Sequence, residues 1–287
     1  MGRRMSGHVV AGVDGSATSI RALDLAAAEA ALHGFVLRVV HVREPDNVWP
    51  IVGSRSAATI DAERVIWNAC RRAAHRHPGL HVDEFIRDGL VVPVLVEESG
   101  TASMTVIGHR GSGGFLGSAA GSVCTQLLAR AHGPVIVTRG TASIDTQSPV
   151  VLGVDAIAPA PAAIGFAYAE ASRRGVALHM VYAWSHQRVA VGFAPPVYGF
   201  ADDRDQAARL LSEATAGWSQ LYPDVKVETV VEHSLDPPAA MRRAAREAGL
   251  VVVGPPDQSA AHGLLSGSVA TALTNHARCP VAVVHRR

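Results

Sequence analysis

The chain has 287 residues, 48% of them hydrophobic, which is enough for two domains of ordinary size. A net charge of +1 and an aromatic content of 5% argue against a nucleic-acid surface with base-stacking side chains. The three cysteines have no zinc-ligand spacing and suit a reducing cytoplasm better than a disulfide scaffold. Nor is there an apolar run of about 18 residues to span a membrane, so we expect a cytoplasmic protein without a metal site.

Apolar runs alternate with helical patterns along the first half of the chain. We predict strands at 8–13, 35–42, 80–87, 103–108 and 134–138, and helices at 17–33, 60–77, 91–101 and 120–132. Valine-rich runs such as Val36–Val42 are typical of strands buried on both faces. Strands that alternate with helices predict a parallel, doubly wound sheet.

The second half of the chain repeats the first. The segments 8–16 and 149–157 both carry an apolar run that ends in Gly-Val-Asp, which makes Asp14 and Asp155 equivalent. Three later residues recur at a constant offset of 146: Gly108, Gly121 and Pro134 have the counterparts Gly254, Gly267 and Pro280. We therefore expect two domains, 1–140 and 149–287, joined by a polar linker. The strands of the second are expected at 149–154, 176–183, 225–231, 249–254 and 280–285.

A glycine-rich run, GHRGSGGFLGSAAGS at 108–122, follows the fourth predicted strand and leads into a helix. Bare backbone at such a strand end can direct N–H groups at an anion, and the helix N-terminus adds its dipole. Doubly wound sheets bind ligands at this edge. A flexible loop with a serine helix cap is the alternative, and Asp14 likewise fits either a binding role or a turn.

Three known nucleotide motifs do not fit this run. The P-loop requires Gly-Lys-Ser/Thr, and the one lysine of the chain is Lys226. The dinucleotide fingerprint lies in the first strand–helix turn and would require glycine where Leu116 stands. A nucleotidyltransferase-like signature would place Gly-His in the first loop, whereas Gly108-His109 follows the fourth strand.

The pattern that remains resembles the universal stress protein family. ATP-binding members carry Gly, two residues, Gly, nine residues and Gly-Ser/Thr, a spacing that Gly108, Gly111 and Gly121-Ser122 reproduce. Asp14 after the first strand and Pro-Val-Ile-Val at 134–137 resemble the family too. The resemblance covers nearly the whole chain, twice, and is to the tandem type common in actinobacteria. It implies two tandem α/β domains, each a doubly wound, five-stranded parallel sheet of the Rossmann-like, adenine-nucleotide-binding kind.

The resemblance also implies a site for ATP in the first domain. Asp14 and the main chain near Val42 would hold the nucleoside. The phosphates would lie among Gly108, Gly111, Ser112, Gly121 and Ser122. Arg110 is either a phosphate contact or a solvated loop residue. Asp14 is also a candidate ligand of Mg²⁺ and His109 a candidate base, beside structural or solvent-facing roles for both.

The second copy departs from the family pattern. Pro255 and Pro256 remove two N–H donors where the first copy has His109 and Arg110. Asp257 replaces the second glycine, and its carboxylate would repel a phosphate. We therefore expect ATP in the first domain, and a structural role or a less charged ligand in the second.

The expected function is that of an ATP-binding regulatory protein in stress responses, at most a weak ATPase. A slow ATP-hydrolysing enzyme and a ligand-free interaction module are the alternatives. We expect the two copies to form an intramolecular pseudo-dimer, with a homodimer as a further option, and no nucleic-acid or membrane partner. The long segments 43–59 and 184–203 contain prolines and are candidate lids or surface loops.

Overall fold

The structure is a computed structural model that describes residues 7–44, 57–111, 121–139, 147–155, 159–184, 200–234, 236–255 and 263–285. The chain divides into two compact units. Unit 1 comprises residues 1–141 together with 285–287, and unit 2 comprises residues 142–284. Ser112, most of both candidate lids and residues 140–146 of the candidate linker lie outside the described residues. Among the described residues, no helix is long and apolar enough to cross a membrane.

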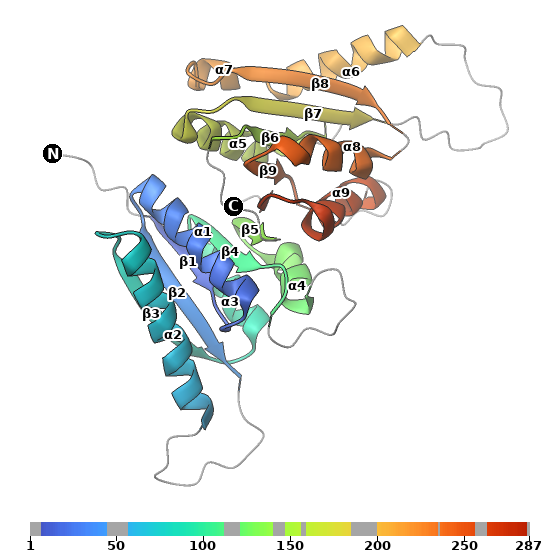
Figure 1. Ribbon diagram of the computed structural model, residues 1–287. Coiled ribbons are helices and arrows are strands. Elements are labelled where there is room, and N and C mark those ends of the chain that lie inside the picture. The colour runs from blue at the N-terminus through green and yellow to red at the C-terminus, as the bar shows by residue number, and fades with distance from the viewer. Residues whose placement is uncertain are drawn as a thin grey trace. The chain divides into compact units, whose positions relative to one another are not determined.

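Unit 1 alternates strands and helices as the sequence predicts (Figure 1). Its elements are β1 (His8–Gly12), α1 (Ala17–His33), β2 (Val36–Arg43), α2 (Ala57–Arg76), β3 (Val82–Asp88), α3 (Val91–Thr101), β4 (Met104–Gly108), α4 (Ser122–Arg130) and β5 (Pro134–Thr138). The strands run parallel in the order β3-β2-β1-β4-β5. The predicted parallel sheet is therefore confirmed.

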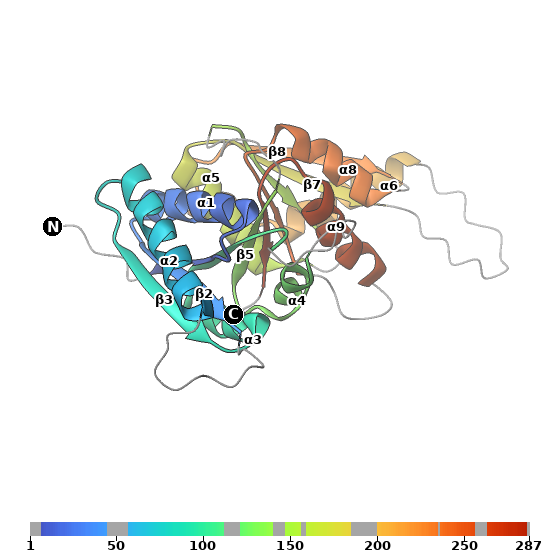
Figure 2. The same ribbon diagram turned by 60° about the horizontal axis from the view of Figure 1, so that its bottom comes forward.

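Helices cover both faces of the sheet in unit 1. Helix α1 packs against α2, and α3 packs against α4 (Figure 2). Right-handed crossovers explain this division: the chain moves from β1 outward to β3 over one face and returns through β4 to β5 over the other. Because both faces are covered, β1 buries Val9, Val10 and Ala11 completely.

Unit 2 repeats this arrangement. Its elements are β6 (Val150–Gly153), α5 (Pro161–Arg174), β7 (Leu178–Trp184), α6 (Phe200–Ala214), α7 (Trp218–Leu221), β8 (Val227–His233), α8 (Pro237–Ala244), a 3₁₀ turn (Ala245–Glu247), β9 (Leu250–Val253), α9 (Gly263–His276) and β10 (Val281–Val284). The parallel order β8-β7-β6-β9-β10 corresponds strand for strand to that of unit 1. The prediction of two tandem doubly wound domains is confirmed.

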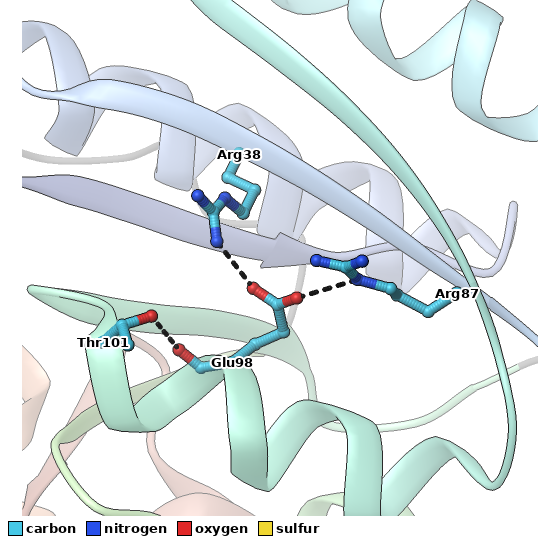
Figure 3. A network of polar contacts seen from close by, with 4 residues as sticks. All are labelled: Arg38, Arg87, Glu98 and Thr101. Atoms are coloured by element: carbon cyan, nitrogen blue, oxygen red, sulfur yellow. Dashed lines mark hydrogen bonds and ion pairs between the residues drawn. The ribbon is translucent and has the colours of Figure 1, made fainter.

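A buried carboxylate joins α3 to the outer strands of unit 1. Glu98, 6% exposed, accepts from Arg38 of β2 at 3.0 Å and from Arg87 of β3 at 3.1 Å (Figure 3). Both guanidinium groups also lie over the ring of Phe85, at 4.6 and 5.0 Å from its centroid. Since each oxygen of Glu98 has a cationic donor, the charge is compensated where the helix meets the sheet.

Candidate functional site

The candidate site of unit 1 lies where the chain leaves β1 and β4. These neighbouring strands continue into α1 and α4, which cover opposite faces of the sheet. A doubly wound sheet opens a crevice at such a switch point, at the carboxyl ends of its strands. Because Ala11 is paired with Val106, Asp14 and the segment Gly108–Gly111 leave the sheet at the same level.

Asp14 organises the first turn of this edge. One oxygen of its carboxylate accepts from the amide of Ser16 at 2.9 Å, and Gly15 between them has a φ of +79°. Ser16 then begins α1, its hydroxyl accepting from the amide of Ser19 at 3.2 Å. The turn role considered for Asp14 is thus present. A carboxylate has about four lone-pair sites, so the turn role is compatible with a hydrogen bond to a ligand hydroxyl.

Gly108 is enclosed by the first turn of α1. A side chain there would place its Cβ 2.8 Å from the carbonyl carbon of Thr18 and 2.9 Å from its oxygen. The hydroxyl of Thr18 also donates to the carbonyl oxygen of Arg110. The glycine therefore lets the segment after β4 approach α1 closely, and Thr18 holds it there.

Gly111 brings the glycine run to Asp14. A Cβ at Gly111 would lie 2.8 Å from the second carboxylate oxygen of Asp14, so a side chain at this position would displace that carboxylate. The structure thus brings together two predicted residues that are far apart in the sequence.

Gly121 closes the run from its other end. Its amide donates to the carbonyl oxygen of His109 at 2.8 Å. A Cβ added at Gly121 would lie 3.5 Å from the Cα of Arg110 and 3.8 Å from the amide nitrogen of Gly111. Gly121 precedes α4, and no side chain caps that helix. The first amides of α4, beginning at Ser122, therefore supply N–H donors beside Gly111.

One predicted residue stands apart from this closure. Val42 lies near the carboxyl end of β2, the strand next to β1, and so occupies the same edge of the sheet. Ser112 lies outside the described residues.

Sequence reasoning missed Thr18. A helix start rich in serine and threonine looks the same in the sequence whether or not a distant carbonyl oxygen lies within hydrogen-bond reach of a hydroxyl.

His109, within the glycine run, is buried beside positively charged arginines. His109 is only 8% exposed, and burial holds the pKa of its imidazole below the usual value. The neighbouring charges of Arg139 and Arg110 lower this pKa further, against a smaller opposing effect of a backbone hydrogen bond with Thr138. The imidazole is therefore uncharged at neutral pH. His109 is a buried group and not the solvated residue that one interpretation of the sequence allowed.

The equivalent edge of unit 2 is built differently. Asp155 follows β6. Burial raises the pKa of the Tyr182 hydroxyl on β7, and the negative charge of Asp155 raises it further. A Cβ at Gly254 would lie 3.0 Å from that of Ala160, which precedes α5 without a side-chain cap. Pro255 follows, while Pro256 and Asp257 lie outside the described residues.

A concave feature lies on α2 and does not belong to this edge. It is lined by Asn68, Arg71, Arg72, His75 and Arg76. Crossover helices run antiparallel to their strands, so this C-terminal part of α2 faces the amino ends of the strands. Arg72 already donates to Asp24 at 2.7 and 2.8 Å, which gives the hollow a structural role.

Fold and site together define a class: a tandem protein of two doubly wound parallel α/β units, the first of which closes a glycine run at its switch point. The profile of the Universal stress protein family matches residues 5–139 and again residues 148–285. The chain belongs to the universal stress protein family.

Individual relatives agree with this assignment. A universal stress protein of Mycolicibacterium smegmatis is 36% identical over 295 residues, with 97% of each chain covered. One of Mycobacterium tuberculosis is 35% identical over 290 residues, again with 97% of each chain covered. The crystal structure of a universal stress protein from Archaeoglobus fulgidus has a TM-score of 0.73 at 16% identity, covering 99% of this chain and 100% of that one, and supports the fold.

Proposed function

We propose that unit 1 binds ATP and that the protein acts as a nucleotide-dependent regulator in stress responses. The observation that carries the proposal is the closure of the glycine run, in which Gly111 meets Asp14 while Gly121 meets the segment His109–Gly111. The main-chain N–H groups of the run and the uncapped start of α4 therefore lie close together at the switch edge, where they can bind an anion.

The donor set suits a nucleotide. Main-chain N–H groups at a helix start stabilise phosphate oxygens, and a carboxylate at a neighbouring strand end can accept from ribose hydroxyls. Asp14, the main chain near Val42 and the segment from Gly108 to Ser122 would share these tasks. Mg²⁺, when it accompanies the nucleotide, would neutralise part of the phosphate charge.

Substitution at Gly121 tests the proposal. Its backbone angles, φ −67° and ψ 155°, suit a β-branched residue, and an added Cβ would have its nearest neighbours at 3.5 Å. Gly121→Val should therefore fold normally but crowd the phosphates, and calorimetric titration should show ATP affinity reduced about tenfold or more. Gly267→Val, at the equivalent position of unit 2, is the matched control and should retain the wild-type affinity.

Two results would contradict this assignment. A folded Gly121→Val protein with wild-type affinity would mean that the run is only a loop, and a larger loss for Gly267→Val would place the site in unit 2. Mass spectrometry of molecules released on heating the purified protein separates the remaining functions: ATP supports a regulator, AMP with pyrophosphate supports an enzyme, and no ligand supports an interaction module.

A further inference from the structure

Three side chains with ring or guanidinium nitrogens meet at the ends of β4 and β5, and two of them are cationic arginines. Gly108 is paired with Thr138, so His109 and Arg139 are the first residues beyond these two paired strands. The amide of His109 donates to the carbonyl oxygen of Thr138 at 3.1 Å, which fixes the two strand ends together. Arg110 follows His109 directly. We call His109, Arg110 and Arg139 the cationic cluster, after its two arginines.

Each member of the cationic cluster has a buried nitrogen without a hydrogen-bond partner among the described residues. These atoms are Nδ1 of His109, Nε of Arg110 and one terminal nitrogen, Nη1, of Arg139. Buried polar atoms are nearly always paired, because an unpaired one has lost its hydration without compensation. Three such nitrogens on neighbouring residues indicate a common acceptor.

The chain supplies no carboxylate for this role within the described residues. Neither Arg110 nor Arg139 forms an ion pair there, and residues 112–120, which follow the cluster in sequence, contain no aspartate or glutamate. The two arginines instead repel each other. Burial lowers the pKa of Arg139, and the positive charge of Arg110 lowers it further. The charge of Arg21 on α1 adds to the field at His109. A site with this field favours an anion from outside the chain.

We propose that the cationic cluster receives the outermost phosphate of the nucleotide held by the glycine run, so that unit 1 distinguishes nucleotides by their number of phosphates. This inference rests on the proposed ATP site. The two are adjacent, because the Cα of Arg110 lies 3.5 Å from the Cβ position of Gly121. Arginine can bind phosphate through two parallel hydrogen bonds, and it takes the place of the lysine that unit 1 lacks.

Arg139→Met tests the cluster. The methionine keeps an unbranched side chain but removes the charge and the donors. Calorimetric titrations should show ATP affinity reduced about tenfold or more and AMP affinity changed by less than about twofold. The thermal midpoint without ligand should stay equal or rise, because a repulsive charge is removed. Arg130→Met, which removes an exposed arginine at the end of α4, is the matched control and should bind both nucleotides as wild type does.

The remaining outcomes separate this inference from the proposed function. Wild-type protein that binds neither ATP nor AMP would overturn both. ATP binding that is unchanged in Arg139→Met would overturn only the role of the cluster, as would equal losses for ATP and AMP with a lowered midpoint, which indicate a structural arginine. Inorganic phosphate that binds the wild type but not Arg139→Met, together with unchanged ATP affinity, would assign the cluster to free phosphate and overturn the nucleotide contact.

Discussion

At the scale of single residues, Gly108 and Gly121 belong to one run but have different surroundings. A methyl group at Gly108 would lie 2.8 Å from backbone atoms of Thr18, which cannot yield without moving α1. At Gly121 the nearest atoms would be 3.5 Å away, an ordinary contact. The first glycine therefore serves the approach of α1 to β4, and the second leaves space at the switch edge.

We expect Gly108→Ala to destabilise the protein by about 1–3 kcal/mol, since the methyl group would overpack a tight contact. Urea unfolding of Gly108→Ala, compared with Gly121→Ala as the control at a roomier position, measures the difference. Equal unfolding midpoints for the two variants would show that the Thr18 contact is not restrictive.

His109 should make stability depend on pH. Burial, followed by the charges of Arg139 and Arg110, lowers its pKa in the folded protein. The unfolded chain, with a histidine pKa of about 6.5, then takes up this proton at a higher pH than the folded protein does, so stability is lost as the pH falls below that value. Urea unfolding at about pH 7 and about pH 5 should show a smaller loss for His109→Gln than for the wild type. Equal losses would exclude His109 as the source.

At the scale of the elements, most of the fold could be predicted and the closure of the site could not. Buried valine runs and the repeat predicted the strands, and their alternation with helices predicted a parallel sheet, because periodicity and burial are properties of a local segment. The bond from Thr18 to the carbonyl of Arg110 joins residues 92 positions apart and has no local signal. The same holds for Arg139, whose relation to His109 depends on the pairing of β4 with β5.

Glu98 provides the test at this scale, because it joins α3 to β2 and β3. Glu98→Gln removes the negative charge and leaves Arg38 and Arg87 without a carboxylate, so we expect a loss of about 1–3 kcal/mol in unfolding free energy. Glu97→Gln, at the exposed neighbouring position of the same helix, should change it by less than about 0.5 kcal/mol. Chemical denaturation measures the unfolding free energy of both variants. Equal losses would show that the Glu98 network contributes no more to stability than a surface charge.

At the scale of the whole molecule, two units share one strand order but differ at the switch edge. Unit 1 has an uncapped α4 and a glycine facing Asp14, whereas the segment after β9 in unit 2 continues into Pro255. Proline supplies no amide donor, so the two edges differ in their capacity for phosphate.

We therefore expect a single ATP per chain and turnover well below the roughly 10 s⁻¹ median of enzymes. The reason for slow turnover is that His109 is buried and its low pKa reflects burial and neighbouring charges, not a partner that would activate it as a base. Titration stoichiometry and a phosphate-release assay measure both quantities. Two equivalents of ATP per chain, or hydrolysis at ordinary enzyme rates that is lost in Asp14→Asn, would contradict this expectation.

The anchoring of the glycine run at both ends also bears on how such proteins diversify. The chain is held at Gly111 beside Asp14 and again at Gly121 by the carbonyl oxygen of His109, while the nine residues from 112 to 120 connect these fixed points. A segment whose two ends are held in this way can be replaced as a unit without changing the contacts of the sheet. Transplanting residues 112–120 between relatives should therefore alter ligand preference while leaving the unfolding midpoint close to that of the recipient, which makes this segment a natural place to engineer new specificities.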